Sequence, residues 1–194
     1  MHRPAIKGTA FVSAISDLEE LLASGRLTRE ALEARLRAED LEIIDGKILP
    51  SSWYPIETYG RVLDVLGDAH GGGVQYHVQR GRRAAERLLR SGIYRQLDRA
   101  IEQRTTKDEN SLIGLMLTVG RTLYNFGDWE VVRDGGRGKT FRFEIRDAAA
   151  LPEAGRFAVQ GFVEWAVEHI IGTGRRVDSR RPRPDVVVVE ITRS

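Results

Sequence analysis

The 194-residue sequence contains no cysteine. This absence excludes disulfides, cysteine-ligated zinc, iron–sulfur clusters and thiol nucleophiles, and many enzyme classes with them. No stretch approaches the ~20 consecutive apolar residues that a membrane-spanning helix requires. The N-terminal segment also lacks a long apolar run before Asp17, Glu19 and Glu20, which argues against a secretory signal peptide. We therefore expect a cytoplasmic protein.

The sequence also lacks a strong excess of either charge. Its 30 basic and 28 acidic side chains give a formal charge of +2, and the isoelectric point is about 9.1. Such a balance says little in favour of nucleic-acid binding. The composition, 41% hydrophobic and 30% charged, is that of an ordinary globular protein. The length fits one domain, which we expect to span residues 1–194.

The N-terminal half carries start signals for several helices. Ser16 and Glu19 have the spacing of a capping box, in which both side chains satisfy free backbone amides. Thr28 is a second N-cap candidate, and Pro55 suits the first turn of a further helix. These signals, with the apolar spacing, predict helices at 16–24, 28–40, 56–66 and from 74 onward. Asp45-Gly46 between two short apolar runs predicts a β-hairpin at 41–49.

The C-terminal half predicts a sheet covered by a helix. Helices are expected at 94–103 and from 111, and a long one from Pro152 to Gly172. The strands are expected at 129–133, 140–146, 175–179 and 186–192, the last with an unbroken apolar run that suits a central strand. The fold class is therefore α+β. An N-terminal helical lobe, about 1–127, precedes an antiparallel β-β-α-β-β sheet lobe, about 128–194.

A segment around Trp53-Tyr54-Pro55 carries a family resemblance. The segment is ILPSSWYPIETYGRVLDVL, and a glycine-containing basic helix and the closing hairpin, helix and strand pair follow it. Together they resemble a myxobacterial paralogous family of unknown function with a Trp-Tyr-Pro motif. The fold of that family is similar to the heme-NO-binding and 4-vinyl-reductase-like sensor domains. The resemblance implies a pocket between the helical lobe and the sheet, and a role in sensing.

The resemblance also makes heme binding testable. In the heme-binding branch, a histidine on the helix before the hairpin ligates iron, and a Tyr-x-Ser-x-Arg strand motif clasps the propionates. Here the helix from Ser111 to Phe126 contains no histidine. On the strand only Arg146 matches, because Arg142 and Glu144 occupy the tyrosine and serine positions. We therefore expect no cofactor, with heme binding of that kind doubtful. The cysteine-rich zinc site of phenol-sensing relatives cannot form.

The four histidines offer no metal-binding pattern. None of His2, His70, His77 and His169 forms an i, i+4 pair or an HExxH motif. His77 lies near an apolar stripe and could ligate iron from a different helix. The same two interpretations, iron ligand or core residue, apply to His169, which lies one turn from Trp165. A solitary helical histidine is more often a hydrogen-bonded core residue. We expect no metal site, and leave open whether either histidine binds iron.

Two sets of side chains are candidates for binding. The predicted ligand pocket comprises Trp53, Tyr54, Tyr59, His77, Met116, Phe143, Phe162 and Trp165. Packing between helices and sheet is the simpler explanation for most of its aromatic residues. The predicted basic surface comprises Arg80, Arg82, Arg83, Arg175, Arg176, Arg180 and Arg181. Arginine can bind phosphate or carboxylate groups with two hydrogen bonds, but a solvated surface is the commoner role.

The sequence contains no recognisable catalytic motif, so we expect no enzyme. The serines lack a GxSxG context, and no acidic pair stands out for acid–base catalysis. We predict a sensory or regulatory domain that binds a small apolar or aromatic ligand and signals to an unidentified partner protein. A ligand-free protein–protein interaction module with a basic docking surface is the alternative. Nucleic-acid binding is a third and less expected function, no membrane contact is expected, and a homodimer stays open.

Overall fold

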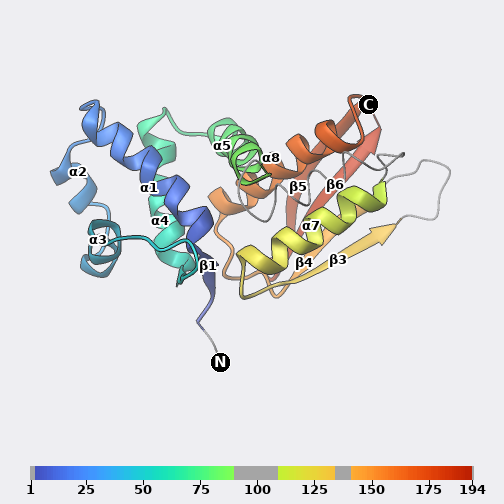
Figure 1. The fold of residues 1–194 in the computed structure, drawn as a ribbon, viewed down its shortest axis with the longest axis horizontal. Helices are drawn as coiled ribbons and strands as arrows, with labels where there is room; N and C mark the ends of the chain where they lie inside the picture. Colours follow the sequence, from blue (N-terminus) through green and yellow to red (C-terminus); the bar gives the residue numbers. More distant parts are fainter. Residues whose placement is uncertain (1–2, 90–108, 134–140, 194) are drawn as a thin grey trace.

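The arrangement of helices and strands is seen in a computed structural model that describes residues 3–89, 109–133 and 141–193 (Figure 1). The helices in these ranges are α1 (Gly8–Ala23), α2 (Arg29–Glu33), α3 (Ala38–Asp45), α4 (Ile56–Ala69), α5 (Val74–Leu89), α7 (Glu109–Leu123) and α8 (Glu153–Ile170). The strands are β1 (Ala5–Lys7), β2 (Trp53–Pro55), β3 (Asp128–Arg133), β4 (Phe141–Arg146), β5 (Arg175–Arg183) and β6 (Val186–Arg193). The α+β class is as predicted.

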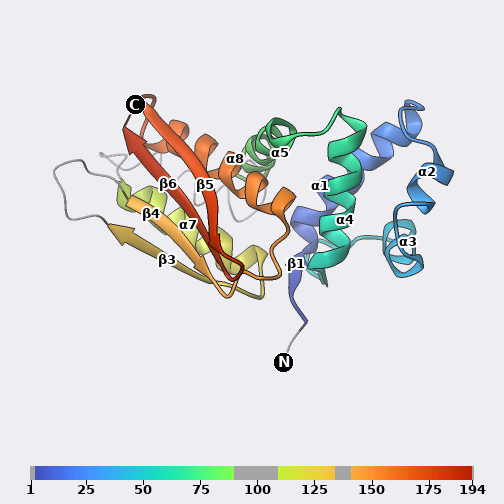
Figure 2. The ribbon, with the colours of Figure 1, turned by 180° about the vertical axis from the view of Figure 1, so that it is seen from behind.

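The four-stranded sheet forms one end of the molecule. Its order is β3-β4-β6-β5, and every neighbouring pair is antiparallel. Strand β6 lies between β4 and β5, the interior position that its apolar run predicted. Val187 and Val189 of this strand are fully buried. Helices α7 and α8 lie on one face of this sheet in both views (Figures 1 and 2). The predicted order of two strands, a helix and two strands is confirmed.

The helical end of the molecule has a hydrophobic core of its own, built from α1 to α4. Phe11 and Leu18 of α1 pack there with Leu63 and Leu66 of α4, all fully buried. A two-stranded sheet, β1 paired with β2, ties the start of the chain to the Trp-Tyr-Pro segment. Sequence patterns gave no sign of this small sheet, because its strands have three residues each. Figure 1 shows the two ends meeting near α5 and α8.

The predicted hairpin at 41–49 is wrong, because residues 38–45 form helix α3. The carboxylate of Asp40 is fully buried and accepts hydrogen bonds from the Arg37 backbone amide at 3.0 Å and from the Thr58 hydroxyl at 2.6 Å. The Arg61 guanidinium donates two further bonds of 2.6 Å to the same carboxylate. These contacts with α4 fix the helix start, so the hairpin tendency of Asp45-Gly46 is overridden.

Helix boundaries also differ at the N-terminus. Thr28 caps a helix as predicted, accepting from the Ala31 amide at 3.2 Å, but this helix, α2, ends at Glu33. Helix α1 begins at Gly8, well before the predicted start at Ser16. Gly8 packs so closely that a Cβ atom there would lie 2.0 Å from the Leu49 carbonyl oxygen. The predicted helix at 94–103 lies outside the described residues, as do residues 134–140 between β3 and β4.

The pairing of α5 with α8 joins the two ends of the molecule. A Cβ atom on Gly81 would lie 2.0 Å from the Ala158 carbonyl oxygen, and one on Gly161 would lie 1.8 Å from the Val78 carbonyl oxygen. The two helices therefore touch backbone to backbone, which only glycine permits. Across the three described ranges, no helix has the length and apolar character needed to cross a membrane.

Candidate functional site

A cavity of about 350 Å³ lies where the helical end meets the sheet end. Its volume is at the small end of the range of roughly 300–1,000 Å³ that small-molecule sites occupy. Helices α1, α4, α5, α7 and α8 and strand β3 contribute to its wall. The lining residues are Thr9, Ala10, Val12, Ser13, Ser16, Tyr59, Arg80, Gly81, Ala84, Arg87, Leu88, Met116, Val119, Gly120, Leu123, Tyr124, Trp129, Ala158, Val159 and Phe162.

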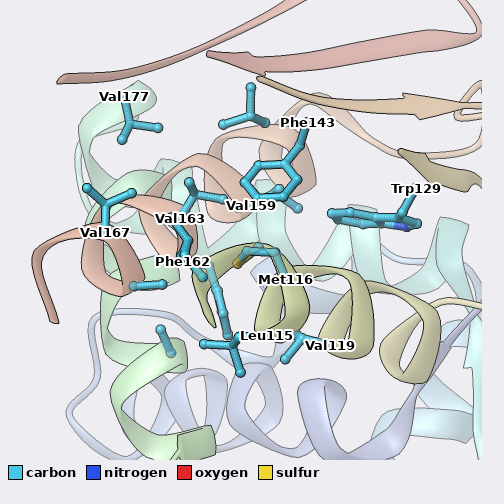
Figure 3. Packing of buried hydrophobic residues seen from close by; sticks show 14 of the residues in the cluster. Leu115, Met116, Val119, Trp129, Phe143, Val159, Phe162, Val163, Val167 and Val177 are labelled. Carbon is cyan, nitrogen blue, oxygen red and sulfur yellow. The ribbon is translucent and has the colours of Figure 1, made fainter. Parts of the chain in front are cut away.

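The wall on the sheet side is apolar. Met116 of α7, Trp129 of β3 and Phe162 of α8 come from three elements and lie near one another in Figure 3. Trp129 fits over Gly120, where a Cβ atom would be 2.5 Å from the indole ring. This glycine lets the indole approach α7, and the apolar groups together suit a hydrocarbon or aromatic ligand.

The wall on the helical side contains a buried arginine. Arg80 of α5 is 1% exposed, and its Nε donates to the Asp17 carboxylate at 3.1 Å. Its Nη1 donates to the Tyr59 hydroxyl at 3.2 Å. Its Nη2 is buried and has no hydrogen-bond partner among the described residues. A buried charge is stable only when it is well paired. Arg80 therefore has one guanidinium nitrogen, Nη2, without a hydrogen-bond partner among the described residues.

Two further polar residues complete this wall. Arg87 is about half exposed, donates from Nη2 to the Ser13 hydroxyl at 2.5 Å, and places Nη1 3.8 Å from the Asp17 carboxylate. Tyr124 also lines the cavity. Burial raises the pKa of the Tyr124 phenol well above its usual range, so this hydroxyl stays protonated and available as a donor. The cavity thus combines apolar walls with donors from arginine and tyrosine.

Three of the predicted pocket residues line this cavity, namely Tyr59, Met116 and Phe162. Two others lie at the small β1–β2 sheet. Trp53 is 43% exposed, with the Lys7 ammonium 4.1 Å from its ring centre. The Tyr54 hydroxyl accepts a hydrogen bond from the Leu49 amide at 2.8 Å.

The remaining predicted pocket residues also lie outside the lining. Phe143 is fully buried in the core between the sheet and its helices, and Trp165 stacks on His169 with ring centres 4.6 Å apart. His77 packs against α4, where a Cβ atom on Gly67 would be 2.7 Å from its Nε2. Burial lowers the pKa of His77, and the nearby charge of Arg80 lowers it further. No histidine within the described ranges lines the cavity.

The strand position expected to hold heme propionates faces away from the cavity. Residues at 141, 143 and 145 of β4 are buried, and Arg146 belongs to the opposite, outer side of the sheet. Its guanidinium pairs with Glu130 at 3.1 Å and with Glu144 at 3.5 Å. In addition, the described part of the chain contains no group of three or more histidine, aspartate or glutamate side chains that could hold a metal ion.

The predicted basic surface is largely neutralised by acidic neighbours. Arg82 pairs with Glu164 and Glu168, and Arg83 is exposed. The other ion pairs are Arg175 with Glu109, Arg176 with Asp178, Arg180 with Glu190, and Arg181 with Glu153. Arg80, predicted as part of this surface, is instead buried in the cavity wall, because Asp17 and Tyr59 accept its hydrogen bonds.

Sequence reasoning missed Arg80, Arg87 and Tyr124 as cavity residues. One signal for Arg80 was available. Arg80, Ala84 and Leu88 follow at intervals of four and therefore share one face of α5, and two of these three residues are apolar. An arginine on an apolar face indicates a buried guanidinium with a specific partner, but the spacing gives no clue to that partner.

Comparison with known proteins identifies the fold. No protein-family model and no curated protein matches the sequence. Among solved structures, a variant H-NOX protein from K. algicida in the unliganded Fe(II) state is similar, with 10% identity, a TM-score of 0.65 and 97% of each chain covered. A variant T. tengcongensis H-NOX has 11% identity and a TM-score of 0.59, covering 97% of this chain and 98% of its own.

An H-NOX protein from S. oneidensis in the Fe(II)NO state matches over 97% of this chain and 99% of its own, with 11% identity and a TM-score of 0.58. At such low identity these matches show the fold alone. They confirm the predicted heme-NO-binding-like fold. The closer resemblance to the myxobacterial family stays a prediction, as does the assignment of residues 1–194 to a single domain.

Proposed function

We propose that this chain is a non-catalytic sensory or regulatory domain. It binds a small apolar or aromatic ligand in the cavity between the helical end and the sheet, and relays occupancy to a partner protein. The observation that carries the proposal is the 350 Å³ cavity itself, with its apolar wall and its buried arginine. The H-NOX fold supports a ligand at this junction by analogy of fold.

Relay to a partner is supported by where the cavity lies. Its wall takes residues from α1 and α4 at one end of the molecule and from α7, α8 and β3 at the other. A ligand in contact with both ends favours the relative arrangement in which it makes the most contacts. Differential binding of this kind is what shifts a conformational equilibrium.

Heme is the first ligand to test, because the K. algicida and S. oneidensis structures are of Fe(II) proteins. Iron in heme proteins is held by histidine, cysteine, methionine with histidine, or tyrosine. Over the described residues no histidine lines the cavity, and the sequence has no cysteine. Of the two lining tyrosines, Tyr59 already accepts a bond from Arg80, and burial raises the pKa of Tyr124, which disfavours the tyrosinate that would bind iron. The residues present do not fit the histidine-ligated heme that the fold suggests, so we derive no function through heme.

The interaction-module and nucleic-acid alternatives both need a surface with unpaired positive charge. Most arginines of the predicted basic surface are instead paired with carboxylates. The neighbouring carboxylates offset the positive potential of this surface, which weakens its attraction for an acidic protein or for phosphates. The ligand-binding domain is therefore the better supported function.

The proposal is tested by measuring ligand binding to the wild-type protein and to a variant whose cavity is blocked. Purified protein is screened by thermal shift and native mass spectrometry against aromatic and alkyl compounds, and its absorbance is recorded after heme addition. We expect stabilisation by at least one apolar compound, and its loss in Ala84→Leu, which places a larger side chain in the cavity wall. Ala31→Leu, at an exposed position of α2, is the matched control and should keep the stabilisation.

Equal stabilisation of the wild type and of Ala84→Leu would place binding elsewhere and contradict the proposal. A flat screen together with a blank heme spectrum would also overturn it. A Soret band that survives in Ala84→Leu would indicate heme bound outside this cavity, with the same consequence.

A further inference from the structure

The side chains that line the cavity carry positive charge without a matching negative charge. Within the described ranges, its lining contains two arginines, Arg80 and Arg87, and no acidic residue. Asp17, just behind the wall, accepts a hydrogen bond from Arg80 and lies 3.8 Å from Arg87. Two guanidinium groups thus share one carboxylate. The group of three carries a net charge of +1, with one member almost fully buried.

Two buried donors in the cavity lining have no hydrogen-bond partner among the described residues: Nε1 of Trp129 in the apolar wall, and Nη2 of Arg80 within this group. The other guanidinium nitrogens of Arg80, Nε and Nη1, have Asp17 and Tyr59. A buried donor without a partner costs stability, and a ligand that supplies an acceptor removes that cost. An anionic acceptor also offsets the net charge, and hydrogen bonds between charged groups are about twice as strong as neutral ones. The cavity therefore favours a ligand with one anionic oxygen group.

The remaining wall defines the rest of the ligand. Met116, Trp129 and Phe162 offer apolar and aromatic contacts and no charge. A dianionic phosphate would exceed the single positive charge available, while a carboxylate matches it. Tyr124, a protonated phenol in the same wall, can donate to such a group as well.

We infer that the ligand of the proposed sensor is a monocarboxylic acid with an apolar body. Its carboxylate binds Arg80, whose Nη2 is closed to solvent, so the guanidinium turns toward the ligand as it binds. The body of the ligand lies against the apolar wall formed by α7, α8 and β3. This inference rests on the proposed function, since it names the chemical class of ligand for the same cavity. It also gives the buried arginine a role that packing alone does not explain.

Matched acids and alcohols test the inference in the wild-type protein. One pair is decanoate and decan-1-ol, and the other is 2-naphthoate and 2-naphthylmethanol, so that alkyl and aromatic bodies are compared separately. Dissociation constants are measured by isothermal titration calorimetry at pH 7.4. We expect the acid of at least one pair to bind about 10- to 100-fold more tightly than its alcohol, the effect of a charge-assisted hydrogen bond.

Variants assign this preference to the arginine. Arg80→Met should abolish the preference for the acid while leaving alcohol binding nearly unchanged. Because Arg80→Met leaves Asp17 with less compensation and can impair folding, the double variant Asp17→Asn and Arg80→Met removes both charges together. Arg82→Met is the matched control, since Arg82 lies on the same helix, pairs with Glu168 and is outside the cavity lining. It should keep the full preference.

The outcomes separate this inference from the proposed function. Equal affinity for acid and alcohol in the wild type would overturn the carboxylate assignment and leave the apolar receptor standing. A preference that persists in both Arg80 variants would also overturn it. Binding of neither member of either pair, together with a flat wider screen, would overturn the receptor and the carboxylate together.

Discussion

The two ends of the molecule differ in what they bury. The core between the sheet and helices α7 and α8 is largely apolar, with Phe143 and Val163 completely inaccessible to solvent, and its buried polar residues are Ser111 of α7 and Arg156 at the start of α8. The helical end buries Asp40, Thr58 and Arg80 as well as its apolar residues. Most charges near the sheet are instead paired at the surface, as in Arg180 with Glu190.

Because of this difference, the two ends should respond differently to pH and to ligands. An apolar core is held by burial and close packing, which do not depend on pH. Buried charged groups are stable only with their partners, so they respond to protons and to ligands. We expect the sheet end to serve as a rigid frame, and the helical end to carry the responses. Three substitutions test that division, beginning with the one that should cost the most stability.

The largest effect is expected for Phe143→Ala in the sheet core. Removing a fully buried phenyl ring should lower the free energy of unfolding by about 3–5 kcal/mol. The loss should be the same at pH 7 and pH 4, because the burial of an apolar ring does not depend on protonation. Urea denaturation followed by circular dichroism measures both values. Phe157→Ala, at a half-buried position beside Arg156, is the control and should cost only about 1 kcal/mol.

The close contact between α5 and α8, which joins the two ends, is tested by Gly161→Ala. The added methyl group would lie 1.8 Å from the Val78 carbonyl oxygen, so α5 and α8 must separate, at a cost of about 1–3 kcal/mol. Gly114→Ala, in an exposed and open position of α7, should stabilise the protein by about 0.5–1 kcal/mol through helix propensity. Thermal melting of the two variants should move in opposite directions. A stabilised Gly161→Ala variant would show that α5 and α8 do not pack backbone to backbone at this position.

A smaller effect is expected from the buried carboxylate of the helical end. Burial alone would raise the pKa of Asp40, but hydrogen bonds from Arg61 and Thr58 outweigh it and lower the pKa from 3.8 to about 2. Because the folded pKa lies below the unfolded one, the stabilisation is present above about pH 4 and is lost as pH falls toward 2. We expect about 2 kcal/mol to disappear over this window.

Asp40→Asn should remove that pH dependence, so that its difference from the wild type in unfolding free energy shrinks from pH 6 to pH 2. Asp45→Asn is the control, because the pair of Asp45 with Arg29 is exposed and solvent weakens it. Parallel acid titrations of unfolding free energy compare the two. An unchanged acid profile in Asp40→Asn would place the acid sensitivity of the helical end elsewhere.

Much of the fold was predictable because its signals are local. Pro55 before α4, Pro152 before α8 and the alternating strand β4 each depend on residues a few positions apart, and each prediction is confirmed. The hairpin predicted at 41–49 failed for the opposite reason. Local turn chemistry favoured it, but Thr58 and Arg61 of α4 bind the Asp40 carboxylate and stabilise a helix there.

The candidate site was predictable only in part. Tyr59, Met116 and Phe162 line the cavity as expected of apolar-face residues, whereas Trp53 and Trp165 have partners elsewhere. Aromatic character alone does not separate a cavity wall from a core, because both bury the same kind of surface. Which aromatic side chains face the cavity depends on how the helices and strand β3 meet.

The amino-acid sequence is enough to predict the fold class, the interior place of strand β6 in the sheet and the exclusion of thiol chemistry, since these follow from periodicity and composition. The burial of Arg80 beside a ligand-sized cavity becomes visible only in the folded chain. Its partners Asp17 and Tyr59 lie 63 and 21 residues away along the chain. The cost of burying a charge depends on partners that only the folded chain brings together.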